Sequence, residues 1–100
     1  MSSVSVNQQG ETVTIAINGR FDFNLLQEFR DAYADMAGSD LKYTVDLSAT
    51  EYIDSSALGM LLNMKNNVKA EDGAITISNC QPNLMKIFSI AHFDKKFNFV

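Results

Sequence analysis

The sequence has little of the chemistry on which enzymes and metal sites usually depend. Its 100 residues include one cysteine, one histidine, one proline and no tryptophan. A single cysteine, Cys80, cannot form an internal disulfide, and one cysteine with one histidine cannot supply a cluster of metal ligands. We therefore expect a reducing compartment, the cytoplasm, with no metal and no cofactor, and we expect Cys80 to be buried or half-buried.

Long apolar runs and concentrated positive charge are lacking too. No stretch approaches the roughly 20 apolar residues that cross a bilayer, and the first residues do not resemble a signal peptide. The formal net charge is −4, and the eight basic residues are scattered apart from Lys95–Lys96. Because nucleic-acid binding needs a concentrated basic surface, we expect a protein partner, with no nucleic acid and no direct membrane insertion.

The chain does have the length and apolar content of one small domain, which we assign to residues 1–100. Of these residues, 46% are apolar and 20% are charged, as is typical of a globular chain with a packed core. Apolar periodicity predicts the order β-β-α-β-α-β-α-β. The first two strands are expected within residues 3–19, on either side of a turn at Gln9–Gly10, and Gly19 ends the second of them. Three further strands are expected at residues 42–48, 74–78 and 96–100.

The connections between these strands predict the fold class. Strand–helix–strand crossovers between residues 42 and 78 imply parallel neighbours, while the first hairpin adds antiparallel strands. We therefore predict an α/β fold of α+β character. It has one mixed sheet of four to five strands, with three amphipathic helices packed mainly on one face.

Three segments carry the helical period. Asn24 is the expected N-cap of the first helix and Gly38 its end, the second helix covers residues 55–69, and the third starts near Pro82. Their predicted buried faces are Leu25, Leu26, Phe29, Ala32, Tyr33 and Met36 in the first, Ala57, Leu61, Met64 and Val68 in the second, and Leu84, Ile87, Phe88 and Ala91 in the third. In the strand at 42–48, Tyr43, Val45 and Leu47 share one side.

The segment YIDSSALGMLL, residues 52–62, places a carboxylate and two hydroxyls at the start of the second helix, after the irregular run ATEYI. Asp54 is the expected N-cap, whose carboxylate accepts hydrogen bonds from free amides of the first turn. Ser55 and Ser56 then occupy the first two helical positions. Aspartate and serine begin many helices, so this pattern is also compatible with a purely structural role.

A second flank of this helix carries Ser56, Gly59, Met60, Asn63 and Asn67. We expect this flank to face outward, with Met60 as an adaptable contact for a partner. An interior glycine costs roughly 1 kcal/mol relative to alanine. Gly59 therefore indicates a place where another backbone comes close.

The sequence offers no catalytic partner for these serines. A serine nucleophile needs a base, and the one histidine, His92, follows the third helix, where a cap or surface role is expected. The G-x-S-x-G pattern is absent. A hydroxyl at a helix start can instead be phosphorylated, which adds about −1.5 to −2 charge that a helix N-terminus tolerates. A partner docked over this position would then meet both bulk and charge.

The segment VDLSATEYIDSSALGMLL closely resembles the signature of the STAS domain, which sulfate transporters and anti-sigma-factor antagonists share. INGRFDFNLLQEFRDAY resembles the upstream strand–helix segment of that family, in which a G-x-x-D element precedes the first helix. ITISNCQPNLMKIFSIAHFDKKF resembles its last strand and C-terminal helix. The resemblance covers nearly the whole chain and implies the STAS fold, a mixed sheet with packed helices.

The resemblance also implies a function, that of a stand-alone cytoplasmic regulator of partner switching. Unphosphorylated members bind an anti-sigma factor or related serine kinase of the histidine-kinase-like ATPase fold, and so free its other client. That kinase phosphorylates the serine after the aspartate, here Ser55, with Ser56 as the alternative. A metal-dependent serine phosphatase reverses the modification. The partner-binding residues that we predict are Asp22, Asp54, Ser55, Ser56, Ala57, Gly59, Met60 and Asn63.

The match has one departure, and other functions stay open. Many members have glycine in place of Ala57, whose methyl group would narrow partner choice or tighten packing. Some stand-alone relatives are accessory subunits of a membrane transporter's ATPase and act without phosphorylation, although the Asp54–Ser55–Ser56 hinge favours the switch. An enzyme would need a base converging on Ser55. Met60 and the edge strand at 97–99 leave room for a weak homodimer.

Overall fold

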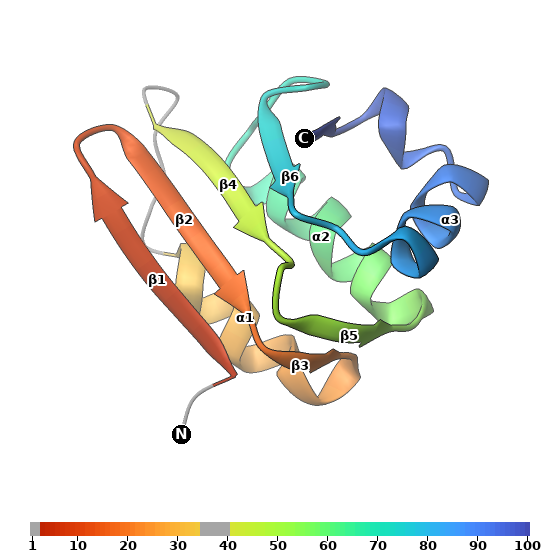
Figure 1. Cartoon of the computed structure of the whole chain (residues 1–100). Helices are drawn as coiled ribbons and strands as arrows, with labels where there is room; N and C mark the ends of the chain where they lie inside the picture. The colour runs from red at the N-terminus through yellow and green to blue at the C-terminus, as the bar shows by residue number, and fades with distance from the viewer. Residues whose placement is uncertain (1–2, 35–40) are drawn as a thin grey trace.

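The computed structural model describes residues 3–34 and 41–100 of the chain (Figure 1). These described residues form seven strands, three α-helices and two short 3₁₀ helices. Their bounds are β1 Val4–Gln9, β2 Thr12–Ile17, β3 Gly19–Phe21, η1 Phe23–Leu25, α1 Leu26–Ala34, β4 Lys42–Asp46, β5 Thr50–Ile53, α2 Ser55–Asn67, β6 Ile75–Ser78, α3 Pro82–Ile90, η2 Phe93–Lys95 and β7 Asn98–Phe99.

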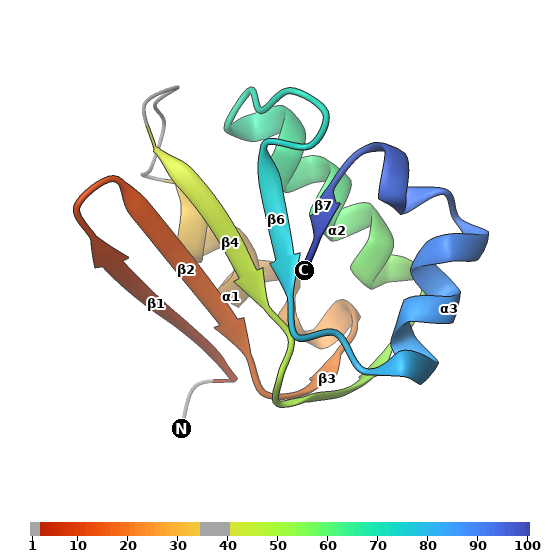
Figure 2. The ribbon, with the colours of Figure 1, turned by 45° about the horizontal axis from the view of Figure 1, so that its top comes forward.

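The main sheet has five strands in the order β1-β2-β4-β6-β7 (Figure 2). β1 pairs antiparallel with β2, and every other neighbouring pair in this sheet is parallel. The predicted mixed sheet, its first hairpin and its C-terminal edge strand are therefore confirmed. Gly10 has a φ of 61°, a left-handed conformation that glycine adopts readily and that the tight turn between β1 and β2 requires.

A second, two-stranded sheet was not predicted. β2 ends at Ile17, and Gly19 starts β3 instead of ending the second strand. The run TEYI, which we expected to be irregular, forms β5 and pairs parallel with β3. Figure 1 shows this β3–β5 ribbon running below the main sheet and leading directly into α1 and α2.

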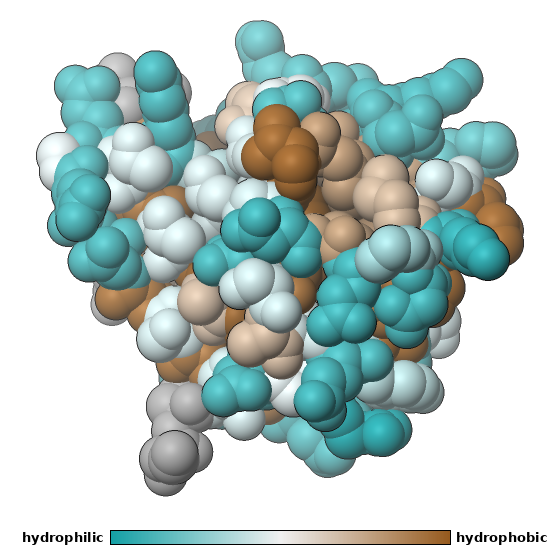
Figure 3. All heavy atoms as spheres, in the orientation of Figure 1, coloured by the Kyte–Doolittle hydropathy of each residue, from teal (hydrophilic) through white to brown (hydrophobic). Residues whose placement is uncertain are grey.

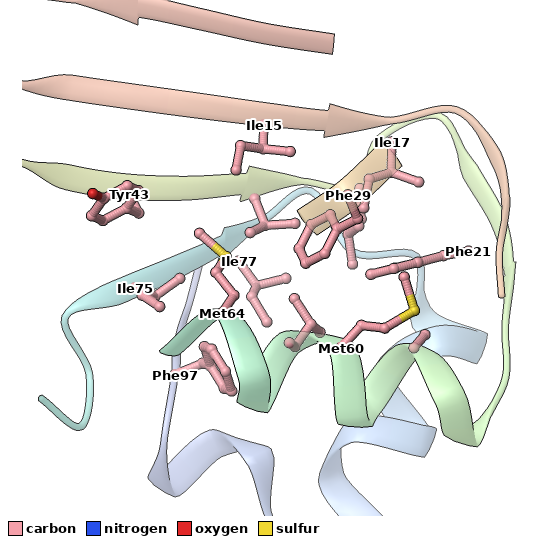
Figure 4. Packing of buried hydrophobic residues seen from close by; sticks show 14 of the residues in the cluster. Ile15, Ile17, Phe21, Phe29, Tyr43, Met60, Met64, Ile75, Ile77 and Phe97 are labelled. Atoms are coloured by element: carbon pink, nitrogen blue, oxygen red, sulfur yellow. The ribbon is translucent and has the colours of Figure 1, made fainter. Parts of the chain in front are cut away.

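The core lies between the main sheet and the helices. α1 and α2 lie behind the sheet in Figures 1 and 2, and α3 lies beside its β6–β7 edge. The predicted face of the strand at 42–48 is confirmed, because Tyr43, Val45 and Leu47 are at most 3% exposed. Figure 4 shows side chains from the sheet and from α2 meeting in this layer. Its fully buried members include Phe21, Phe29, Phe88, Phe97, Ile15, Ile17, Leu61, Met64, Ile75 and Ile77.

The first helix begins differently from the prediction. Asp22, and not Asn24, is the N-cap, because its carboxylate accepts a hydrogen bond from the Asn24 amide at 3.0 Å, and Asn24 lies inside η1. Leu25, Phe29 and Tyr33 are buried as expected, and Leu26 and Ala32 pack against the core at its margin. Met36 and Gly38 lie outside the described residues.

The third helix buries a narrower face than predicted. Leu84 and Phe88 are 2% and 0% exposed, whereas Ile87 is 36% exposed and Ala91 is only half-buried. Phe88 packs on Phe93 and Phe99, which joins α3 to η2 and β7. The helix sits at the edge of the sheet, so a single row of side chains reaches the core. The brown spheres at the right of Figure 3 lie over α3, whose Ile90 is 80% exposed.

Among the helices in the described part of the chain, none is long and apolar enough to span a membrane.

Candidate functional site

Asp54 is the N-cap of α2, as predicted. Its backbone is extended, and its Oδ1 accepts hydrogen bonds from the Ala57 amide at 3.1 Å and from the Ser56 hydroxyl at 2.6 Å. The hydroxyl bond from Ser56 is the largest cause that holds the pKa of Asp54 below its usual value. The carboxylate is therefore ionised at neutral pH and fixes the start of α2.

The two adjacent serines have different environments. Both lie in the first turn of α2, as predicted. The Ser56 side chain is half-buried and donates to Asp54, whereas Ser55 is exposed, and its hydroxyl has no hydrogen-bond partner among residues 3–34 and 41–100. A phosphate on Ser56 would remove the hydroxyl proton that Asp54 accepts. The Ser55 oxygen can be modified without breaking any of these contacts.

The remaining predicted positions on α2 separate into exposed and buried residues. Ser55, Gly59 and Asn63 are exposed, and a Cβ added at Gly59 would have no heavy atom within 4 Å. The expected close backbone is thus absent from the described chain, and Gly59 presents open surface. The prediction that Met60 faces outward is wrong, because its side chain is 3% exposed and points toward Phe21 in Figure 4. Ala57 is fully buried.

Met60 is buried because α2 is covered on two sides. The stripe Ala57, Leu61, Met64 and Val68 faces the core as predicted, with exposures of 0–4%. The unpredicted β3–β5 ribbon covers the neighbouring side of α2 with Phe21 and Ile53, and both of these side chains are buried as well. The buried face of α2 is consequently wider than one stripe. A partner can contact Gly59 and Asn63 but not the Met60 side chain.

The β3–β5 ribbon brings Asp22 to the start of α2. Phe21 and Ile53 are paired across the two parallel strands, so the next residues, Asp22 and Asp54, leave the ribbon at the same end. Each of them caps the helical turn that follows it. Asp22 also forms an ion pair with Arg20, with 3.4 Å between Oδ2 and Nε. The predicted positions Asp22, Asp54 and Ser55 therefore belong to one surface.

Two exposed aromatic residues at this surface were missed by the sequence reasoning. Phe23, which follows Asp22, is 65% exposed, and Tyr52 of β5 is 40% exposed. The Arg20 guanidinium lies 4.0 Å from the centre of the Tyr52 ring, a cation–π contact. The run RFDF gives no sequence signal for this, because residues two apart in an extended segment share one face; Phe23 is exposed because the chain turns into η1 after the cap Asp22.

A buried hydrogen-bond chain ties this surface to the rest of the fold. Thr50 is fully buried, and its hydroxyl donates to the Ile17 carbonyl at 2.8 Å. The side-chain Nε2 of Gln81, just before α3, donates to the Thr50 carbonyl at 3.1 Å. β5 is thus held between β2 and α3. The start of α2, which follows β5, is therefore positioned by contacts with β2 and with the residue before α3.

His92 and Cys80, the one histidine and the one cysteine of the chain, lie outside the start of α2. His92 is exposed and follows α3 in a left-handed conformation, with φ of 60°. Cys80 is half-buried as predicted, and burial raises the pKa of its thiol. Within the described residues, no group of three or more histidine, cysteine, aspartate or glutamate side chains could hold a metal ion.

Comparison with known proteins gives a consistent picture. A family model described as "Mlab, STAS domain" matches residues 4–100. A STAS-domain containing protein of Pseudomonas aeruginosa is 46% identical over 88 residues, which are 88% of this chain and 87% of that protein. The anti-sigma-B factor antagonist of Bacillus subtilis is 27% identical over 90 residues, covering 88% of this chain and 81% of that protein.

Solved structures show the same fold at low sequence identity. The anti-sigma factor antagonist SpoIIAA in its unphosphorylated form superposes with a TM-score of 0.72 at 16% identity, over 97% of this chain and 86% of that chain. The phosphorylated form of Bacillus SpoIIAA gives 0.68 at 18% identity, over 97% and 90%. A sulfate transporter family protein of Wolinella succinogenes gives 0.71 at 14% identity, over 91% and 78%.

Proposed function

Because the chain belongs to the STAS domain family, we propose that it is a partner-switching regulator that acts in the cytoplasm by binding, not by catalysis. Residues 1–100 act as one domain. The unphosphorylated form binds an anti-sigma factor or analogous serine kinase of the histidine-kinase-like ATPase fold and frees its client. Phosphorylation of Ser55 releases the kinase, and a metal-dependent serine phosphatase restores binding.

The observation that carries this proposal is the contrast between the two serines. Ser55 is exposed at the start of α2 and its hydroxyl has no hydrogen-bond partner in the described part of the chain, while Ser56 is half-buried and hydrogen-bonded to Asp54. A kinase can therefore transfer the γ-phosphoryl group of ATP to the Ser55 oxygen, with loss of its proton and release of ADP, without disturbing the cap. This supports Ser55 over Ser56 on structural grounds that are independent of family resemblance.

The electrostatics of the site support a switch in binding and not in fold. A phosphate adds about −1.5 to −2 charge, and the N-terminus of α2 stabilises negative charge. The neighbouring carboxylates Asp22 and Asp54 already make the surface negative. A partner seated over Ser55, Gly59 and Asn63 would have to bury this dianion, which is costly without a matching cation. The scaffold stays folded while the docking surface becomes unfavourable.

The proposal is tested by comparing wild type with Ser55→Ala, Ser55→Asp and the matched control Ser56→Ala. Each protein is used as bait in an extract of the native cell, and the bound proteins and the phosphorylated residue are identified by mass spectrometry. The kinase so identified is then purified for calorimetric titration. We expect wild type and Ser55→Ala to bind it, Ser55→Asp to bind at least tenfold more weakly, and all four to melt within a few degrees of one another.

Two results would contradict this function. Equal affinity of wild type and Ser55→Asp for the kinase would remove the switch. Absence of phosphate from Ser55 peptides of protein isolated in growing, stationary and stressed cells would remove the modification. Phosphate found on Ser56 alone would place the switch at the hydrogen-bonded serine, against the structural argument.

A second function is favoured by the likeness to the sulfate transporter family protein, which shares the fold. In this alternative, the chain is an accessory subunit of a membrane transporter's ATPase and acts without phosphorylation. It predicts that detergent extracts contain the chain in a stable complex with a transport ATPase. It also predicts that Ser55→Ala leaves that complex and its regulation unchanged. The partner-switching function predicts instead that Ser55→Ala stays bound to the kinase constitutively.

A further inference from the structure

We propose that Phe23 is the aromatic anchor of the surface that docks the protein partner, and that it inserts into an apolar pocket rimmed by basic side chains on that partner. The inference rests on the proposed function, because it takes the surface around Ser55 as the place of docking. The proposed function describes only how phosphate on Ser55 repels the partner. This inference adds a contact that attracts the unphosphorylated protein to the partner.

The register of the small ribbon places Phe23 beside Ser55. Phe21 of β3 and Ile53 of β5 are paired, and neighbouring strands lie about 5 Å apart. Phe23 and Ser55 each stand two residues beyond this pair and one residue beyond a capping aspartate. Each is therefore the first residue of a helical turn at the same end of the ribbon. Figure 1 shows η1 and the start of α2 at this end of β3 and β5.

The exposure of Phe23 has no structural explanation within the described chain. The ring is 65% exposed and is not part of the core, while Phe21, two residues earlier, is fully buried against Phe29. Phenylalanine at position 23 is not needed for capping, because Asp22 supplies that hydrogen bond. Aromatic residues, phenylalanine among them, are enriched at the apolar centre of protein interfaces, where a few buried anchors carry most of the binding energy.

The groups around Phe23 describe the partner's chemistry. Asp22, Asp54 and exposed Glu51 carry negative charge on or beside the ribbon. Arg20 pairs with Asp22 and lies over the Tyr52 ring; its side chain is 65% exposed and that of Asp22 is 15% exposed, so this pair adds no net charge and the excess negative charge comes from Asp54 and Glu51. The surface therefore offers an apolar centre with net negative charge around it, and electrostatic complementarity calls for lysine or arginine around an apolar pocket. These cations are matched to the carboxylates of the unphosphorylated surface, so a phosphate on Ser55 adds negative charge that has no cation left to pair with. The partner is a protein that differs from this acidic chain.

The β3–β5 pairing also makes the anchor rigid. Phe23 lies two residues after β3, whose three residues are all paired with β5, and β5 is held by the buried Thr50 hydrogen bond to Ile17. An anchor that is fixed before binding loses little conformational entropy on docking. Phosphorylation of Ser55 then acts on a contact that the fold has already positioned.

The test places p-benzoyl-L-phenylalanine, a photo-crosslinking analogue of phenylalanine, at position 23 of the full chain in the native cell. A matched chain carries the same probe at Ile90, which is 80% exposed on α3. We expect position 23 to give one adduct with a partner that wild type also captures, with the linked peptide in a pocket flanked by lysine or arginine. The adduct is lost when Ser55→Asp is added, and position 90 does not give it.

A second measurement uses the purified partner identified in this way. Phe23→Ser is expected to weaken its binding by about 30-fold or more, the effect of losing an interface hot spot. Its melting temperature stays near that of wild type, because the ring is outside the core. Ile90→Ser is the control for removal of an exposed apolar side chain, and we expect its affinity to equal that of wild type.

The outcomes separate this inference from the proposed function. If wild type captures a partner that Ser55→Asp does not, yet position 23 gives no adduct or Phe23→Ser binds normally, the anchor is refuted and the switch stands. If the adduct forms but Ser55→Asp leaves it unchanged, the anchor stands and the switch fails. An adduct with a second copy of this chain, or neither adduct nor capture, overturns the inference.

Discussion

Replacement of the capping carboxylate tests how the start of α2 is held. In Asp54→Ala, Oδ1 no longer accepts the 3.1 Å hydrogen bond from the Ala57 amide or the 2.6 Å bond from the Ser56 hydroxyl. Loss of an N-cap side chain typically costs about 0.5–2 kcal/mol. For a 100-residue chain, a loss of about 1 kcal/mol lowers the melting temperature by about 4–8 °C. We expect a decrease of this size at pH 7.

The pH dependence of the same variant follows from the pKa of the carboxyl. The pKa of Asp54 in the folded protein is below its usual value, so the unfolded chain binds the proton more readily. The stabilising contribution is therefore fully present above the unfolded pKa, which is about 3.9, and is lost as pH falls through the folded value. The difference between wild type and Asp54→Ala should shrink as the pH is lowered below about 4.

Calorimetric melting of wild type, Asp54→Ala, Asp54→Asn and Glu71→Ala from pH 7 to pH 3 provides the assay. Asparagine is as good an N-cap as aspartate, so Asp54→Asn should lose only the charge–dipole part, about 0.3–1 kcal/mol. Glu71 is exposed, and Glu71→Ala controls for the change in net charge. The reasoning is refuted if Asp54→Ala melts like wild type at pH 7, or if its deficit is unchanged at pH 3.

Two further substitutions test the packing that supports the site. Thr50→Val removes the buried hydroxyl that donates to the Ile17 carbonyl and leaves that acceptor unsatisfied. We expect the free energy of unfolding, measured by denaturant titration, to fall by about 1–3 kcal/mol. An unchanged unfolding midpoint would contradict the role of this bond. Met60→Ala should cost about 2–5 kcal/mol because the side chain is 3% exposed, whereas Ile90→Ala should stay within about 0.5 kcal/mol of wild type. Equal stability of these two variants would mean that Met60 faces solvent.

The part of the site that could be predicted from the sequence is the part made by neighbours along the chain. The N-cap Asp54, the helical positions of Ser55 and Ser56, and the buried stripe from Ala57 to Val68 all depend on contacts within four residues or on the helical period. The alternating strands β2, β4 and β6 of the main sheet were also predictable, because each of them buries one side. These features need no knowledge of what packs against them.

The predictions that failed depended on which element covers which. The helical period assigns Met60 to a flank of α2, but it cannot say how wide the buried face is, and the β3–β5 ribbon makes that face wider. The prediction for Ile87 was wrong in the opposite direction. Ile87 was expected to be buried, but α3 lies at the sheet edge and buries only a narrow row of its side chains. Asn24 was a good cap by residue type, but Asp22 is the residue whose backbone is extended and whose carboxylate reaches the next turn.

The sequence alone determined that a hydroxyl would stand at a helix start behind a capping carboxylate, since that arrangement is local. The tertiary structure decided that Asp22, Phe23 and Ser55 share one surface, because two strands of three and four residues, about thirty positions apart, pair in parallel. Strands this short carry no readable period, and their pairing is fixed by the burial of Phe21 and Ile53 in a core that exists only once the chain has folded.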